Sequence, residues 1–299
     1  MWWEMRKMKA RRNVKLISEI EKWLSYQPEP KSYTFSFVRV TENIKPDETI
    51  TRLIQEKLMF SYNTDSYYLH YFNETATEED IRKFVIEQVI PTNNNQFDRN
   101  VQQGDWGEIL ASLIVKYFQK LEIPINKLQW KMNKKKSVFG TDLLAFNNSE
   151  KIEDIYYYEI KTRQNPNKKE GKKGEPKQFI SILAYKSLQK DAESPTESII
   201  NFLYKLYIEK EDFETANKFR DIMKNPQNYN KKYKLFLIVE TTKFNEQMLS
   251  ELNGLPPTLS PLNVTVVLID NLKQLVKNTW QDIENVLVDR YMTNEAVQL

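Results

Sequence analysis

The stretch IYYYEIK at residues 155–161 decides how this chain is expected to fold. Its β-branched and aromatic residues predict a strand that ends in an acid, Glu159, and a base, Lys161. Residues two apart in a strand point to the same face, so these two side chains should project together while Ile160 faces the other way. Two other Glu-x-Lys tripeptides lie in a loop rich in Gly, Pro and Lys, so the position at a strand end makes this copy informative.

A second acid, Asp142, opens the preceding strand candidate after a Gly-Thr pair. Charges at the ends of apolar strands are costly unless they are solvated, paired or bound to a metal. If the two strands are neighbours, Asp142 and Glu159 form a mutually repulsive pair of carboxylates suited to Mg²⁺ or Mn²⁺. A third acid, Glu108, begins the next helix upstream, where Gly107 would let another backbone or a substrate come close.

Hard oxygen ligands beside an ammonium group are what phosphodiester hydrolysis requires. We therefore predict Asp142, Glu159 and Ile160 as the metal site, with Lys161 orienting the nucleophile or stabilising phosphate oxygens. Glu108 completes the predicted catalytic set. The alternative is purely structural: Asp142 as a turn residue, Glu159 and Lys161 as an exposed ion pair, and Glu108 as an acid favoured by the helix dipole.

The composition limits the other chemistries that this chain could perform. Its 299 residues are 40% hydrophobic and 28% charged, which predicts one or two globular domains. Without cysteine there is no disulfide framework, thiolate nucleophile or cysteine-containing zinc site, and the single histidine, His70, disfavours a Ser-His-Asp triad. No apolar stretch approaches the roughly 20 residues of a membrane span, so we expect a soluble, cytoplasmic protein without a membrane partner.

The net charge of +3 is too small to indicate nucleic-acid binding, but the lysines are unevenly distributed. One run covers residues 127–136 and another covers residues 168–177, and together they bracket the predicted strands. Solvated surface is the alternative interpretation of both runs. The residues predicted to contact DNA are Lys134, Lys135, Lys136, Lys168, Lys169, Lys172, Lys173 and Gln178, the last on the following helix.

Hydrophobic periodicity divides the chain into two parts, with a boundary near residue 97 in a polar, Asn-rich hinge. Residues 1–96 are expected to form a small α/β segment that regulates the protein or docks a partner. Its expected elements are helices over 1–26 and 49–60, a helix capped by Thr77, and extended runs at 33–40 and 67–72. Residues 97–299 are expected to form the nuclease domain with closing α/β elements.

The second part has the order helix, three strands, helix, and then further helices and strands. The expected helices cover 104–121, 178–189, 196–210 and 211–224. The expected strands cover 128–132, 142–146, 155–161, 233–239 and 264–269, of which the last two are apolar enough to be buried on both faces. This order predicts a mixed α/β sheet flanked by helices.

Over residues 100–190 the sequence resembles the PD-(D/E)xK nuclease superfamily. The resemblance rests on Glu108, the strand start Gly140-Thr141-Asp142 and the tripeptide Glu159-Ile160-Lys161. It implies a restriction-endonuclease-like αβββαβ core, with Asp142 and Glu159 as metal-binding acids, Lys161 as the catalytic lysine and Glu108 as the helix acid. Thr141 replaces the proline of the signature, and the absence of a histidine before Asp142 disfavours RecB-type exonucleases.

More narrowly, the length, the small N-terminal α/β segment and the Gly-x-x-Gly-Glu helix resemble the HamA family, the nuclease subunits of the Hachiman anti-phage system. This resemblance implies a Mg²⁺-dependent DNA endonuclease and a partner, a superfamily 2 helicase of the HamB type, which would gate cutting. Two alternatives remain open: a standalone restriction- or repair-type endonuclease, and a non-catalytic DNA-binding scaffold subunit.

Overall fold

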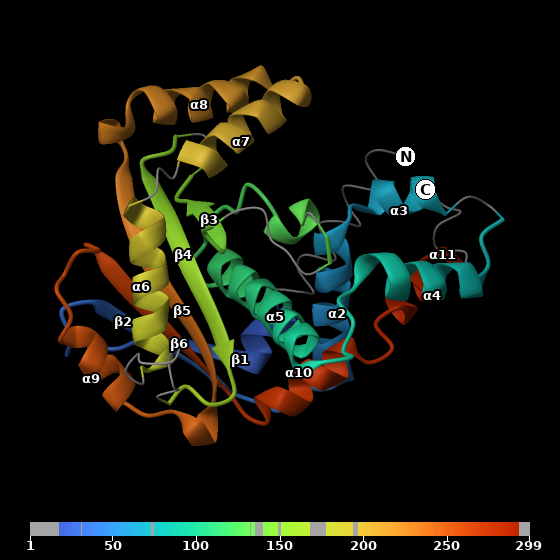
Figure 1. Ribbon diagram of the computed structural model, residues 1–299, viewed down its shortest axis with the longest axis horizontal. Coiled ribbons are helices and arrows are strands. Elements are labelled where there is room, and N and C mark those ends of the chain that lie inside the picture. The colour runs from blue at the N-terminus through green and yellow to red at the C-terminus, as the bar shows by residue number, and fades with distance from the viewer. Residues whose placement is uncertain are drawn as a thin grey trace.

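A computed structural model of the chain describes residues 18–30, 32–72, 75–131, 133–134, 140–148, 151–167, 178–193 and 197–292. Within these ranges a six-stranded sheet of order β1-β2-β6-β5-β4-β3 forms the centre of the molecule (Figure 1). Helices lie on both faces of this sheet. The mixed α/β class predicted from the sequence is therefore confirmed.

The four inner strands of the sheet run parallel, and the edge strands β1 and β3 pair antiparallel with their neighbours. The strands are β1 (Leu24–Pro28), β2 (Ser36–Glu42), β3 (Leu143–Phe146), β4 (Asp154–Arg163), β5 (Asn230–Glu240) and β6 (Leu262–Ile269). The apolar runs predicted at 233–239 and 264–269 are confirmed as central strands, β5 and β6. Residues 235–239 are fully buried, as expected for parallel strands covered on both faces.

Each face of the sheet has its own hydrophobic core. Helices α2, α5 and α10 pack over one face, and α6 and α9 pack over the other (Figure 1). The helices are α2 (Glu48–Tyr62), α3 (Asp65–Tyr71), α4 (Glu78–Phe84), α5 (Gln96–Tyr117), α6 (Ile180–Glu193), α7 (Glu197–Glu209), α8 (Phe213–Lys224), α9 (Gln247–Asn253), α10 (Leu272–Trp280) and α11 (Asn285–Met292). Among the described residues, none of the helices has both the length and the apolar character to cross a membrane.

Alternation along β4 fixes the direction of its charged side chains. Tyr158 and Ile160 belong to the core beneath α5, whereas Tyr157 belongs to the core beneath α6. Because strand residues alternate between faces, Glu159 and Lys161 lie on the α6 side.

The run Tyr67–Phe72 was expected to be extended, and this prediction is wrong. The segment forms α3, whose first turn is capped by the Thr64 hydroxyl, which accepts the backbone N–H of Tyr67 at 3.1 Å. Tyr68 and Phe72 are four residues apart and both buried, which is helical spacing. A short run so rich in aromatic residues fits both the helical and the strand period, and tertiary packing decides between them.

Over the described residues 128–131 of the strand expected at 128–132, no strand forms, because residues 127–130 make a 3₁₀ turn whose Lys127 and Leu128 are buried. Beside β3, in place of a full strand, Glu122 and Phe146 form a single antiparallel bridge with two 2.9 Å hydrogen bonds. The described core therefore has two strands, β3 and β4, between α5 and α6, and not the three of the predicted αβββαβ order.

The expected N-terminal helix ends earlier than predicted. Residues 18–23 are helical, β1 begins at Leu24, and residues 1–17 lie outside the described ranges. β1 pairs with β2, and the Trp23 indole donates a 2.7 Å hydrogen bond to Glu42 at the end of β2. Strand pairing thus overrides the helical pattern of residues 24–26.

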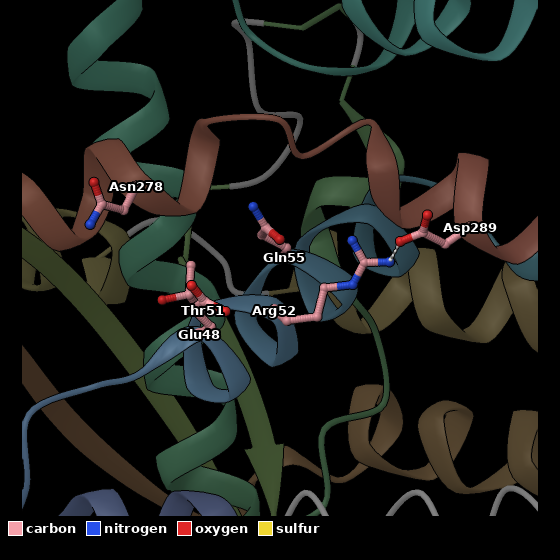
Figure 2. A pocket seen from close by; sticks show the side chains of 6 residues that line it. All are labelled: Glu48, Thr51, Arg52, Gln55, Asn278 and Asp289. Atoms are coloured by element: carbon pink, nitrogen blue, oxygen red, sulfur yellow. Dashed lines mark hydrogen bonds and ion pairs between the residues drawn. The ribbon is translucent and has the colours of Figure 1, made fainter. Parts of the chain in front are cut away.

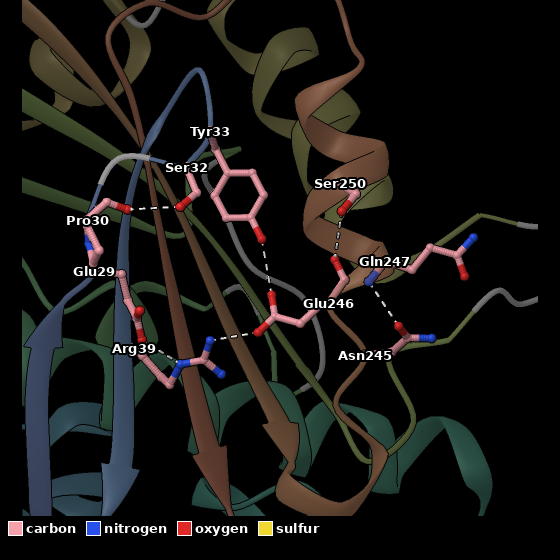
Figure 3. Close-up of polar contacts among 9 residues, drawn as sticks. All are labelled: Glu29, Pro30, Ser32, Tyr33, Arg39, Asn245, Glu246, Gln247 and Ser250. Atoms are coloured by element: carbon pink, nitrogen blue, oxygen red, sulfur yellow. Dashed lines mark hydrogen bonds and ion pairs between the residues drawn. The ribbon is translucent and has the colours of Figure 1, made fainter.

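The N-terminal strands are built into the same sheet as the rest of the chain. β2 pairs with β6, and Arg39 of β2 bonds both Glu29, at 2.8 Å, and Glu246 beside α9, at 2.7 Å (Figure 3). Glu246 also accepts a hydrogen bond from the Tyr33 hydroxyl at 3.1 Å. The boundary expected near residue 97 falls in the first turn of α5, and the division into two functional parts stays a prediction.

Candidate active site

Strand pairing places the two predicted metal-binding acids side by side. Leu143 of β3 pairs with Tyr158 of β4, and the backbone N–H of Asp142 donates to the Tyr158 carbonyl at 3.1 Å. One step further along this antiparallel register, Asp142 faces Glu159. The structure thus brings both carboxylates to one end of the β3–β4 pair.

Both oxygens of the Asp142 carboxylate have partners. Oδ2 accepts the backbone N–H of Ile160 at 2.8 Å, which fixes the carboxylate against β4. Oδ1 accepts from Nζ of Lys127 at 3.2 Å. Lys127 belongs to the 3₁₀ turn, and its side chain is 7% exposed. The sequence pointed to no role for this lysine at the site.

Glu159 is a buried acid, 2% exposed, that forms an ion pair with Lys161 two residues along the strand. Burial raises the pKa of Glu159 to about 7, and the neighbouring Asp142 charge adds to this effect. The Lys161 ammonium and the Ser187 hydroxyl of α6 act in the opposite direction. Burial works against the charge of Lys161, but Glu159 and Asp142 outweigh it and raise the pKa of this lysine.

Glu108 approaches from the other side of the sheet, on α5. This helix lies close to β4 because residue 107 is glycine: a Cβ there would come within 1.8 Å of Oγ1 of Thr162. Burial raises the pKa of Glu108 to about 8, opposed by Lys127 and reinforced by the Asp142 and Asp105 charges. Within the described residues, Glu108 forms no ion pair of its own.

Helix α6 adds a fourth acid that sequence reasoning missed. Asp191 lies against the turn before β3, where a Cβ on Gly140 would be 3.0 Å from its Oδ1. Burial and the Asp142 charge raise the pKa of Asp191, while Lys127 and Lys161 lower it. Ser187 and Asp191 are four residues apart on α6, so the available signal was a polar pair on one helix face.

The donor set at the strand ends fits a hard divalent cation. Asp142 and Glu159 supply carboxylate oxygens, and Ile160 between them could supply only its backbone oxygen. Burial is the main cause of the raised pKa values of Glu108, Glu159 and Asp191, and the Asp142 charge adds to each of them. In the described part of the chain, however, no three His, Cys, Asp or Glu side chains are grouped closely enough to hold a metal, so Glu108 and Asp191 are not additional ligands in this arrangement.

The family model for HamA matches residues 20–283. The chain belongs to the HamA family. It is therefore a subunit of the Hachiman defence type, and the matched range includes all six strands as well as Glu108, Asp142, Glu159 and Lys161. A comparison with curated proteins gave no match.

A second buried charge cluster in this HamA chain lies one turn before Glu108 on α5. Nζ of Lys131 bonds both oxygens of Asp105 at 2.6 Å, and the Tyr62 hydroxyl of α2 bonds the same carboxylate. The Lys131 side chain is 8% exposed and that of Asp105 is 5% exposed. Lys131 belongs to the lysine run at residues 127–136, and its ammonium is bonded to Asp105 inside the protein instead of lying on the solvated surface.

The other predicted DNA contacts fare differently. Lys134 is half-buried and its Nζ donates to the Ile86 carbonyl at 2.7 Å. Gln178 was expected on the helix, but it lies two residues before the first residue of α6. Six of the predicted contacts lie outside the described residues: Lys135, Lys136, Lys168, Lys169, Lys172 and Lys173.

A separate polar pocket of about 430 Å³ lies between α2, α10 and α11 (Figure 2). Its lining consists of Glu48, Thr51, Arg52, Gln55, Asn278 and Asp289. Arg52 of α2 and Asp289 of α11 form an ion pair at 2.7 Å, so this pocket is a seam where the N-terminal and C-terminal helices are tied together.

Proposed function

We propose that this HamA chain is a metal-dependent DNA endonuclease of an anti-phage complex. The observation that carries the proposal is the juxtaposition of Asp142 and Glu159 on paired strands, with Lys161 bonded to Glu159. A scaffold protein would not need buried acids with raised pKa values at a strand end, since each costs stability when it ionises. Family membership supports the same assignment.

The residues have distinct proposed roles. A bound Mg²⁺ or Mn²⁺ would be held by Asp142, Glu159 and the Ile160 carbonyl, and would supply charge neutralisation and a more acidic water. Lys161 is the most exposed of these charged groups, at 32% of its side chain, and it orients the nucleophile or binds the phosphate oxygens. Glu159 must give up its proton before it can bind metal, and its raised pKa makes metal binding weaker below about pH 7.

The test is cleavage of plasmid and linear DNA by the purified chain, alone and with the partner subunit. Cutting should require Mg²⁺ or Mn²⁺ and should stop when EDTA is added. The matched control is the same reaction with excess Mg²⁺ restored after EDTA. Undiminished cutting in EDTA would contradict the metal mechanism.

We further propose that a superfamily 2 helicase binds the N-terminal part and restrains cutting until DNA is sensed. Helix α3 offers an apolar surface for this contact, with Tyr67 45%, Leu69 41% and Tyr71 54% exposed. Co-purification with the helicase should fall at least about tenfold in the double variant Tyr67→Ser, Tyr71→Ser, because exposed aromatic anchors dominate such interfaces. Phe213→Ser on α8, 58% exposed, is the matched control and should leave recovery unchanged.

Equal recovery of the helicase by both variants would remove α3 from the interface.

The lysines at 134–136 and 168–173 stay proposed contacts to the phosphate backbone of DNA.

A further inference from the structure

Lys127 lies at the site but is not among the residues that carry the nuclease resemblance. Its Nζ contacts Oδ1 of Asp142 at 3.2 Å, and only 7% of its side chain is exposed. The 3₁₀ turn that replaces the expected strand directs this lysine inward. Burying a lysine lowers the stability of the fold unless an acid compensates its charge. Asp142 supplies that compensation for Lys127.

Lys127 is one of several described lysines that act on the acids around Asp142. Lys161 is bonded to Glu159, whereas Lys127 is bonded to Asp142 and acts electrostatically on Glu108 and Asp191. The Ile160 N–H already holds Oδ2 of Asp142. Lys127 therefore contacts Oδ1, the remaining oxygen of Asp142, which a metal ion would need as a ligand.

We infer that Lys127 is an internal counter-ion that a divalent cation displaces from Asp142. The inference rests on the proposed metal dependence. A divalent cation on Asp142 would lie within a few ångströms of the ammonium, and like charges at that separation repel strongly where water is scarce. Lys127 thus balances the charge of Asp142 before metal arrives, and it lowers the affinity of this acid for metal.

The first experiment measures the reactivity of Lys127 in the wild-type chain. Reductive methylation is followed by peptide mass spectrometry, with and without saturating Mg²⁺. Methylation of Lys127 should rise several-fold with Mg²⁺, because the ammonium leaves Asp142. Lys131, which is equally buried and bonded to Asp105, is the internal control and should not change. Unchanged Lys127 reactivity under Mg²⁺ would overturn the inference.

The second experiment measures Mn²⁺ affinity by calorimetry for Lys127→Met, Lys127→Arg and Lys131→Met. Lys127→Met should bind Mn²⁺ about tenfold more tightly than wild type, since the competing charge is gone. Lys127→Arg keeps the charge and should stay close to wild type, as should Lys131→Met. Equal or weaker binding by Lys127→Met would overturn the inference.

Failure of this inference is distinguishable from failure of the proposed nuclease. DNA cutting by the wild type together with unchanged Lys127 reactivity would overturn the counter-ion role alone. Release of Lys127 by Mg²⁺ without any DNA cutting would support the counter-ion role and contradict the nuclease. Absence of Mn²⁺ binding in the wild type and all three variants would overturn both.

Discussion

Two inward-facing lysines, Lys127 and Lys131, each form an ion pair with an aspartate, but the two pairs differ in how completely they close the carboxylate. Lys131 reaches both oxygens of Asp105, and Tyr62 closes the same carboxylate. Lys127 reaches a single oxygen of Asp142, at the longer distance of 3.2 Å, and Glu108, Glu159 and Asp191 add their charges around that acid. The first carboxylate is closed by side chains at both of its oxygens, whereas the second has a single lysine contact at one oxygen.

The difference teaches where function can be sought in a protein rich in charges. A buried acid with two strong partners on its own carboxylate has little left to offer a ligand. An acid whose cation is held by one longer contact, and also acts on neighbouring acids, can exchange that cation for a metal. The predictions below test whether the two pairs really differ in this way.

The largest expected effect is on stability, at the complete pair. Lys131→Met leaves Asp105 buried without its cation and should lower the free energy of unfolding by about 3 to 5 kcal/mol. Urea denaturation measures this. The double variant Lys131→Met, Asp105→Leu should recover most of the loss, since replacing both partners by apolar groups is close to neutral. A loss no larger than that of Lys151→Met, at a side chain 80% exposed, would show that the pair is not structural.

The next effect is on catalysis, at the open pair. Asp142→Asn keeps the shape of the side chain but removes a metal ligand, so the cleavage rate should fall by about 10²- to 10³-fold or more. Single-turnover cleavage at saturating Mg²⁺ measures this. Asp105→Asn is the matched control: it should lower the melting temperature more than Asp142→Asn does, and should keep cleavage when assayed well below that temperature. If both variants cut DNA at wild-type rates, the two pairs are equivalent and the site is misassigned.

The juxtaposition of Asp142 and Glu159 could be predicted because it depends on local rules. Strand alternation placed Glu159 and Lys161 on one face, and the strand before it carried Asp142 at its start. The close packing of α5 against β4 at Gly107 could also be predicted, because glycine has no side chain to keep the two backbones apart. Family membership, anticipated from these motifs, is confirmed by the match over residues 20–283.

The two lysine pairs could not be predicted, because a run of lysines does not reveal which of them turn inward. Lys127 bonds Asp142, which lies just before β3, and Lys131 bonds Asp105 on α5. A turn at residues 127–130, where a strand was expected, positions both lysines.

The smallest expected effect contrasts Glu108 with Asp105, one turn apart on α5. Burial raises the pKa of Glu108 to about 8 in the folded protein, while the unfolded chain titrates near the ordinary value of 4.5. Its contribution to stability is therefore fully present below about pH 4.5 and is lost as the pH rises towards 8, because the unfolded state releases the proton first. Glu108→Gln removes this loss and should stabilise the metal-free protein at pH 8 by about 1 to 2 kcal/mol, with little effect at pH 5. Denaturation in EDTA at both pH values measures it. Asp105→Asn should have the opposite sign at pH 8, since it strands Lys131. Destabilisation at pH 8 by both variants would contradict the burial penalty assigned to Glu108.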